Sequence, residues 1–69
     1  MQTFTGTYQG VYPILPYGTL RDLVINTKDG KQNIHVHFKR IEEQTKGLKK
    51  GDRVELRFID YDTFTITRL

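Results

Sequence analysis

The chain has 69 residues, a mass of 8.1 kDa, 36% hydrophobic residues and no cysteine. This length suits one small domain over residues 1–69 and excludes a second one. Without cysteine there is no disulfide and no thiolate for metal binding or nucleophilic attack, which excludes a disulfide-rich secreted scaffold. The net charge of +3 and the pI of about 9.4 are compatible with a polyanionic partner but do not require one.

The first residues and the apolar segments bear on localisation. Residues 1–5 lack the basic, apolar and small-residue order of a signal peptide, and the apolar stretches run for only a few residues. We therefore expect a soluble cytoplasmic protein that does not associate with a membrane.

Alternation marks the first predicted strand. Serine, alanine and tryptophan are absent, whereas threonine recurs near both ends of the chain, which favours strands. Residues 3–11 alternate with a period of two residues and predict a strand, and Gly6 and Gly10 inside it predict a bend or bulge. Two prolines then predict a loop over residues 12–18.

A hairpin is predicted next. Residues 19–28 and 31–39 form two predicted strands joined by the two-residue turn Asp29-Gly30, which is a strong hairpin signal. If Lys28 faces Lys31, the apolar side chains share one face and the other face is mostly polar. The predicted opposite pairs are Ile25 with Ile34, Leu23 with Val36, Arg21 with Phe38, Val24 with His35, Asp22 with His37, and Asn26 with Asn33.

The second half of the chain predicts a short helix and two strands. Residues 40–46 have acidic residues early and a lysine late, and Gly47 follows as a left-handed cap, which is typical of a helix. Apolar and charged residues alternate from Arg53 onward and predict a fourth strand. Residues 60–62 predict a turn, and residues 63–69 a fifth strand.

This order of elements predicts the fold class. An all-β protein with a bent first strand and a short helix between strands three and four has the layout of the five-stranded OB-fold barrel. Barrel closure would remove the exposed sheet edges of so small a protein. An SH3-like barrel or an open meander with a helical turn is the alternative.

Several short motifs resemble those of a known family. The motifs are Gly6-Thr7-Tyr8, Asp29-Gly30, Gly51-Asp52-Arg53-Val54-Glu55-Leu56, Tyr61-Asp62 and Ile66-Thr67-Arg68. Over most of the chain they are similar to the bacterial translation initiation factor one family, and the resemblance implies membership of the wider group of nucleic-acid-binding OB barrels. That family carries a basic stretch after its third strand that contacts ribosomal RNA. Here only Lys39 and Arg40 are basic, and two glutamates follow, so we assign no ribosome binding.

The predicted function is non-catalytic binding of single-stranded nucleic acid, DNA or RNA. OB barrels bind such strands across the outer face of strands two and three and the flanking loops. Stacking side chains and cations that could contact bases and phosphates are the candidate residues. They are Tyr12, Tyr17, Lys28, Lys31, His35, His37, Lys39, Arg53 and Arg57.

Each of these candidates has a second interpretation. Tyr12 and Tyr17 could cap the end of the barrel, because tyrosine commonly buries its ring and leaves its hydroxyl in water. The cations could form a solvated surface on which Glu55 neutralises Arg53 and Arg57.

Metal binding and catalysis are not predicted. His35 and His37 have a spacing that could chelate zinc, but no further ligand is evident. Serine and cysteine are absent, and no base stands beside another nucleophile in the pattern. We therefore expect no enzyme activity, no metal and no cofactor.

The alternative function is protein binding. The first loop carries Ile14 and Leu15 between two prolines, and an exposed apolar pair beside tyrosines would suit an interface. The protein would then be an accessory subunit or a phage- or plasmid-type regulator, or would form a homodimer through this loop.

Overall fold

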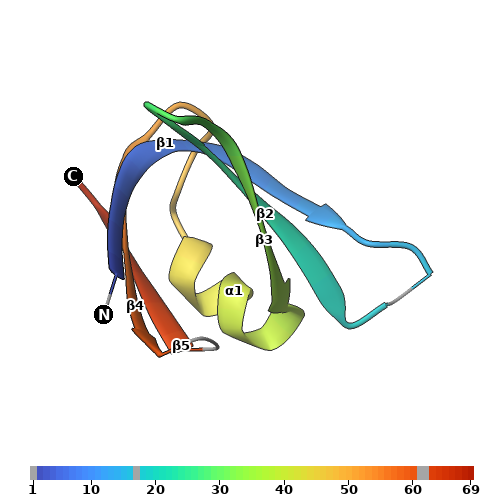
Figure 1. Ribbon diagram of the computed structural model, residues 1–69. Coiled ribbons are helices and arrows are strands. Elements are labelled where there is room, and N and C mark those ends of the chain that lie inside the picture. The colour runs from blue at the N-terminus through green and yellow to red at the C-terminus, as the bar shows by residue number, and fades with distance from the viewer. Residues whose placement is uncertain (1, 17, 61–62) are drawn as a thin grey trace.

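The computed structural model describes residues 2–16, 18–60 and 63–69. Within these ranges the chain forms a five-stranded antiparallel sheet and one short helix, with the strands in the spatial order β3-β2-β1-β4-β5 (Figure 1). The elements are β1 (Gln2–Pro13), β2 (Leu20–Thr27), β3 (Gly30–His37), α1 (Phe38–Thr45), β4 (Arg53–Asp60) and β5 (Thr63–Arg68). The predicted all-β class and the helix between the third and fourth strands are confirmed. Within the described residues no helix has the length and apolarity to cross a membrane.

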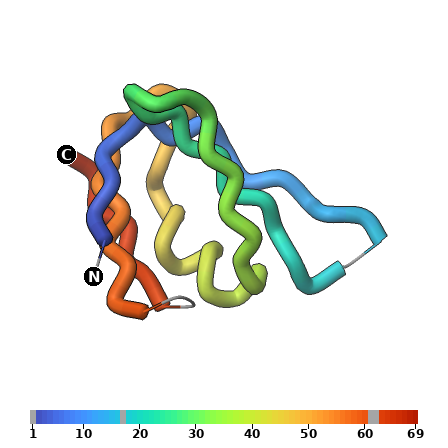
Figure 2. Tube along the Cα trace, in the orientation of Figure 1, coloured from blue at the N-terminus to red at the C-terminus, as the bar shows by residue number. Residues whose placement is uncertain are grey.

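The sheet is open between its two end strands. In the described chain β3 pairs only with β2, and β5 only with β4, so closure into a barrel is not observed. Figure 2 shows the strands arching around α1, which contacts β2, β3 and β5. The helix therefore lies where a pairing of β3 with β5 would close the sheet.

A glutamine from the helix covers part of the β5 edge. The Gln44 side-chain nitrogen donates to the Phe64 carbonyl at 3.2 Å, and the Ile66 amide donates to Gln44 Oε1 at 3.0 Å. Backbone groups at a sheet edge need such partners when they are partly buried. The Gln44 amide thus supplies the two hydrogen bonds that a neighbouring strand would otherwise provide.

The core lies on the concave side of the sheet, under the helix. Alternate residues of the strands point there, as the period-two pattern predicted, and Ile41 of α1 is fully buried against them. The buried cluster comprises Tyr8, Leu23, Ile25, Val36, Ile41, Val54, Leu56 and Phe64.

Two glycines allow β1 to bend. The pairing of β1 with β2 shifts register between Tyr8 and Gly10, and Gly10 has a φ of +121°, a value that L side chains rarely adopt. At Gly6 a Cβ would lie 2.7 Å from Ile25 Cγ2 and even closer to the Asn26 carbonyl oxygen. The predicted bulge is confirmed at Gly10, and Gly6 permits a close approach of β2.

The hairpin register differs from the prediction by two residues. Thr27 faces Gly30, so Lys28-Asp29 forms the turn, and Leu23 faces Ile34. The predicted Asp29-Gly30 turn of the favoured type would need positive φ at both residues, but only the glycine has it, at +112°. The Asp29 amide instead donates to Thr27 Oγ1 at 3.2 Å, which supports the earlier turn. A shift of two residues keeps every side chain on its predicted face.

The helix begins two residues before the predicted start. His37 ends β3 and caps α1, because its Nδ1 accepts a hydrogen bond from the Lys39 amide at 3.3 Å. The third strand therefore stops at His37 rather than at Lys39. Gly47 has the predicted positive φ, at +85°, after the C-cap residue Lys46.

Candidate functional site

The convex outer face of β1, β2 and β3 gathers polar side chains in three rows across the strands. Tyr12 of β1 lies beside Asp22 of β2, which faces His35 of β3. The next two rows are Gly10 with Val24 and Asn33, and Thr7 with Asn26 and Lys31. Because side chains alternate along each strand, these rows share one surface.

This surface is hollowed beside the Tyr12 ring, which itself lies over Gly10. A cavity of about 340 Å³, which we call the outer-face cavity, lies within the size range of small-ligand sites. Val24 lines it and is buried although it lies outside the core cluster, so it provides an apolar floor. The lining residues are Gln9, Tyr12, Asp22, Val24, Asn26, Lys31, Asn33 and Lys50.

Tyr12 forms a fixed aromatic wall of this cavity. Its hydroxyl donates to the Gln9 carbonyl at 2.9 Å, and its ring lies so close over Gly10 that a Cβ there would be 3.0 to 3.3 Å away. The side chain is nevertheless 48% exposed. A ring held in place at the surface can stack on a planar ligand with little loss of side-chain entropy.

Asp22, in the same row as Tyr12, has spare hydrogen-bonding capacity. Its Oδ2 accepts a hydrogen bond from the Asn33 side-chain nitrogen at 2.8 Å. Its Oδ1 is a buried side-chain oxygen without a hydrogen-bond partner in the described part of the protein. An unpaired buried acceptor is costly and needs an explanation.

Lys50 reaches the cavity from the segment that precedes β4. This segment is fixed to β1 by two backbone hydrogen bonds of 2.8 Å, from the Gly51 amide to the Tyr8 carbonyl and from the Tyr8 amide to the Asp52 carbonyl. Lys31 stands on β3 and also lines the cavity. Two exposed lysines from separate segments therefore flank the hollow that Tyr12 borders.

The buried neighbour Tyr8 lies beneath this region. Burial raises the pKa of the Tyr8 phenol, a hydrogen bond with Thr45 lowers it in part, and nearby Tyr12 raises it further. Tyr8 therefore stays neutral at physiological pH and belongs to the core rather than to the outer surface.

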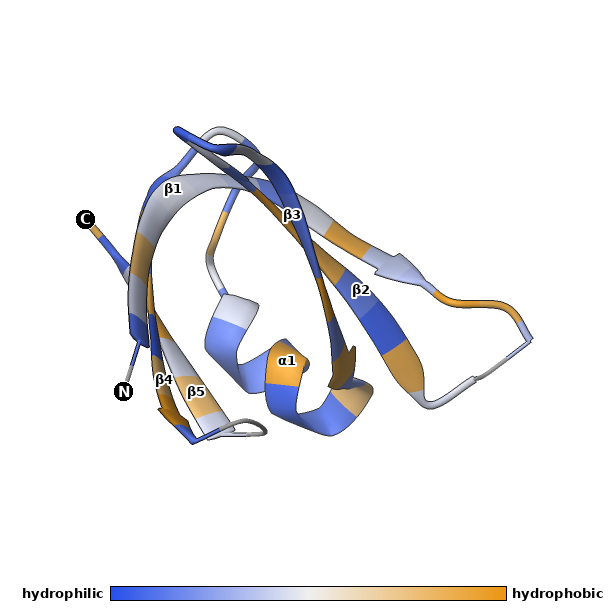
Figure 3. Ribbon diagram, in the orientation of Figure 1, coloured by the Kyte–Doolittle hydropathy of each residue, from blue (hydrophilic) through white to orange (hydrophobic). Residues whose placement is uncertain are grey.

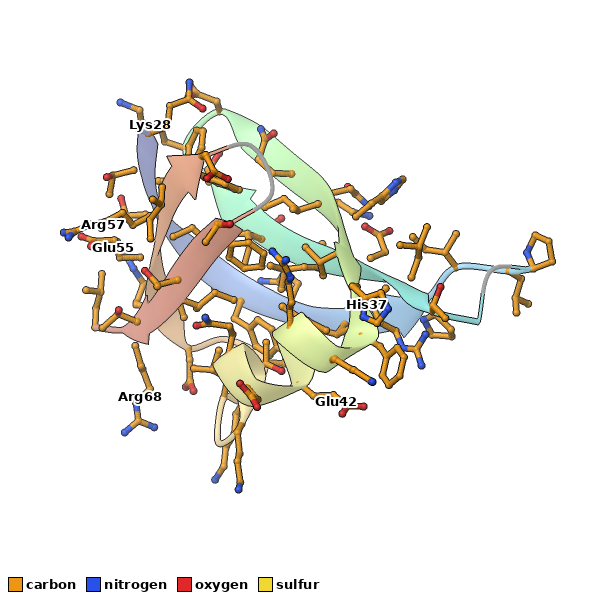
Figure 4. The ribbon with its side chains drawn as sticks, turned by 90° about the horizontal axis from the view of Figure 1, so that it is seen from below. Lys28, His37, Glu42, Glu55, Arg57 and Arg68 are labelled. Carbon is orange, nitrogen blue, oxygen red and sulfur yellow. The ribbon has the colours of Figure 1, made fainter. Side chains whose placement is uncertain are left out.

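The two histidines lie outside the outer-face cavity. Both line a second cavity of about 460 Å³ at the edge of β3, beside Phe58 and Phe64. His37 stacks on Phe38 with a ring-centroid distance of 4.9 Å and caps the helix, and Figure 4 shows it beside the start of α1. Its imidazole is thus engaged in a structural role. Within the described residues no group of three or more histidine, aspartate or glutamate side chains could hold a metal ion.

Most of the other predicted cations are dispersed. Lys28 lies in the hairpin turn and lines a separate cavity with Arg53, and Lys39 is on the exposed side of α1. Arg57 forms an ion pair with Glu55 at 3.5 Å, so one of the predicted neutralising pairs is present, and Figure 4 shows the two side chains together on β4. Tyr17 lies outside the described residues.

The first loop carries an exposed apolar residue. Leu15 is 85% exposed, whereas Ile14 is half-buried and its amide donates to the Leu20 carbonyl at 3.4 Å. Figure 3 shows this segment, directly after β1, in hydrophobic colours and beyond the body of the sheet. Of the predicted apolar pair, Leu15 is therefore open to solvent and Ile14 only in part.

A larger cavity of about 520 Å³ lies on the concave side of the sheet. Phe4 and Phe58 line it, and their rings meet edge to face with centroids 5.9 Å apart. Its lining is mostly hydrocarbon, with Gln2, Thr27, Gln32 and Asp60 at the polar positions. It offers apolar contact rather than the cations that a nucleic acid needs.

Two residues of the outer-face cavity, Tyr12 and Lys31, were predicted as site residues. The polar side chains between them, above all Asp22 and Asn33, were not. Alternation along β2 and β3 already placed both on the polar face, but the predicted register separated them by four residues along β3.

Comparison with known proteins adds no relative. No protein-family model matches this chain, and no match was found among curated proteins or among solved structures. The outer-face cavity and its side chains are therefore the basis for assigning a function.

Proposed function

We propose that this protein binds single-stranded nucleic acid, DNA or RNA, without catalysis, in the outer-face cavity. The observation that carries the proposal is the position of the exposed Tyr12 ring, with Lys31 and Lys50 beside it on one hollowed surface. Proteins that bind single strands combine aromatic stacking platforms with cations along the backbone path.

The energetics favour this use of the surface. A base that stacks on an aromatic ring contributes about 1–3 kcal/mol. Each lysine that contacts a phosphate adds a salt-dependent contribution through counterion release. Asp22 in the lining of the cavity would repel a phosphate, so the bases face the sheet and the phosphates follow the rim lined by Lys31 and Lys50.

We also propose that the chain is an OB fold. The strand order, the bent β1 and the helix between β3 and β4 support this assignment. OB folds are partly open Greek-key barrels that bind oligonucleotides on the face of strands two and three, where the outer-face cavity lies. The resemblance to the translation initiation factor one family enters the proposal at this level alone, as membership of the nucleic-acid-binding OB barrels.

The function can be tested by fluorescence anisotropy with labelled single-stranded DNA, single-stranded RNA and duplex DNA. Each probe is titrated at about 50 and 200 mM salt, a range over which phosphate contacts weaken markedly. We expect a single strand to bind best, and Tyr12→Ala to weaken it about tenfold, from the loss of one stacked base. Arg57→Ala, on the far face and already paired with Glu55, is the matched control and should change little. Equal losses in both variants, or no binding of any probe, would contradict the proposal.

A second candidate function has one observation in its favour. The 85% exposed side chain of Leu15 stands in an apolar segment that projects from the sheet, which suits the docking of a protein partner or a second copy. Light scattering over a concentration series tests the dimer version. A shift from monomer to dimer that Leu15→Ser abolishes would support it, and a monomer at every concentration would exclude it.

A further inference from the structure

We propose that the outer-face cavity prefers guanine among the bases of a single strand, with the Asp22 carboxylate binding the Watson–Crick edge of the base. This inference rests on the proposed function and assigns a ligand to the same site. It starts from the spare acceptor capacity of Asp22, whose two oxygens accept one described hydrogen bond between them.

The surroundings place a base edge near this carboxylate. Asp22 is directly beside Tyr12 in the pairing of β1 with β2, and both line the outer-face cavity. A base stacked on the exposed Tyr12 ring would therefore present an edge toward β2. Val24, one row along the same face, gives the base an apolar floor.

Guanine matches the hydrogen-bonding groups best. Its Watson–Crick edge carries two adjacent donors, N1–H and the N2 amino group, which can bind the two oxygens of one carboxylate. Cytosine and adenine each present one amino donor beside an acceptor nitrogen, and thymine or uracil presents one N–H between two carbonyls. The acceptor nitrogen or carbonyl would face the carboxylate unfavourably, so these bases lose the second contact.

Asn33 completes the recognition. It is exposed, and its amide nitrogen donates to Asp22 Oδ2 at 2.8 Å. Oδ1 is buried, so binding of the base requires Asn33 and the carboxylate to rotate until both oxygens face the cavity. The Asn33 amide nitrogen can then donate to guanine O6. The negative charge of Asp22 also favours a base edge over a phosphate at this position. A carboxylate repels phosphate but accepts strong hydrogen bonds from base N–H groups.

The test compares short oligothymidylates that carry one central base, which is thymine, guanine or hypoxanthine. Hypoxanthine keeps N1–H and O6 of guanine but lacks the N2 amino group. We expect guanine to bind about tenfold more tightly than thymine, which is the order of discrimination by a bidentate contact. Hypoxanthine should fall between the two, and Asp22→Asn should bring the guanine-to-thymine ratio close to one. Glu55→Gln removes the same charge from the other face and should leave the ratio unchanged.

The outcomes separate the two proposals. Binding of all three oligonucleotides with equal affinity overturns the guanine preference and leaves single-strand binding intact. A guanine preference that persists in Asp22→Asn overturns the role of this carboxylate. Failure to bind any of the strands overturns the proposed function and the inference with it. Circular dichroism of Asp22→Asn shows whether the variant is folded, and Asn33→Ala, at an exposed position, gives a second variant that should lower the same ratio.

Discussion

The two outer surfaces of this sheet differ although β1 contributes to both. On the β1-β2-β3 side, Tyr12, Lys31 and Lys50 surround a cavity with Asp22 in it. On the β1-β4-β5 side, threonines of β1 and β5 flank a row of charges on β4. That row consists of Arg53, Glu55 and Arg57, and its cross-strand neighbours are Thr3, Thr5, Thr7, Thr65 and Thr67.

Charge alone does not distinguish these surfaces, since both carry two basic residues. The difference arises at Gly10, where the bulge turns Tyr12 outward and the absence of a side chain lets the ring pack directly over the backbone. On the other side Glu55 pairs with Arg57 and thereby reduces the positive potential. The two surfaces thus differ in the arrangement of a ring, a hollow and cations rather than in the number of their cations.

The largest expected effect comes from the strand that both surfaces share. Gly6→Ala would place a methyl group against Ile25 and the Asn26 backbone, and a backbone obstacle cannot rotate away. We expect a loss of about 3 kcal/mol in the free energy of unfolding, the upper part of the range for overpacking. Gly18→Ala, where a Cβ would meet nothing within 4 Å, is the matched control. Urea denaturation measures both, and equal stability of the two variants would contradict the close approach of β2.

A substitution at the bulge should damage one surface more than the other. Gly10→Ala combines a φ of +121° with a methyl group pressed against the Tyr12 ring. We expect about 1–2 kcal/mol of destabilisation from the backbone strain, and weaker binding of a single strand because the ring is displaced. Tyr12→Phe keeps the ring and removes only its exposed hydrogen bond to Gln9, so it should retain most of the affinity. A Gly10→Ala variant with normal affinity would show that the position of the ring is unimportant.

The two sets of cations should differ in salt dependence. Lys31→Gln with Lys50→Gln is expected to flatten the slope of log affinity against log salt by about 0.7 for each lost phosphate contact. Arg53→Gln with Arg57→Gln removes the same charge from the other surface and should leave the slope close to that of the unaltered protein. Anisotropy titrations at four or more salt concentrations measure these slopes. Identical slopes for the two double variants would mean that binding depends on the net charge of the protein and not on the two lysines at the outer-face cavity.

The smallest effect concerns pH and the tyrosine beneath the face. Because burial raises the pKa of Tyr8 in the folded state, the unfolded chain loses this proton first as pH rises. The contribution of neutral Tyr8 to stability is therefore complete below about pH 10, the ordinary pKa of tyrosine, and is lost as pH rises through the higher folded value. The midpoint temperature of thermal unfolding should fall more steeply above pH 10 in the unaltered protein than in Tyr8→Phe. Parallel curves would contradict the burial of this phenol.

Much of the fold follows from the sequence because alternation and glycine positions are local signals. All five strands, the helix, the bulge at Gly10 and the cap at Gly47 were predicted within a few residues. The hairpin register was not, because a turn at Asp29-Gly30 and one a residue earlier suit the same pattern, and the φ of Asp29 decides between them.

The site was less predictable than the fold. Contact between Asp22 and Asn33 depends on the hairpin register, and Lys50 reaches the cavity only because its segment is bonded to β1. The alternating pattern placed His37 inside the third strand, but its imidazole caps the following helix. Apart from this cap, such roles depend on contacts between segments that are distant in the sequence, and the alternation of apolar and polar residues does not predict these contacts.

Amide chemical-shift mapping by NMR, with a short single-stranded oligonucleotide added to the isotope-labelled protein, tests the central claim most directly. It reports on both outer surfaces of the sheet in one titration. We predict that the largest shifts cluster at Tyr12, Asp22, Asn33 and Lys50, whereas Glu55, Arg57 and Thr65 shift little. Shifts centred on the β4 row, or shifts confined to the segment around Leu15, would contradict the assignment of the nucleic-acid site to the outer-face cavity.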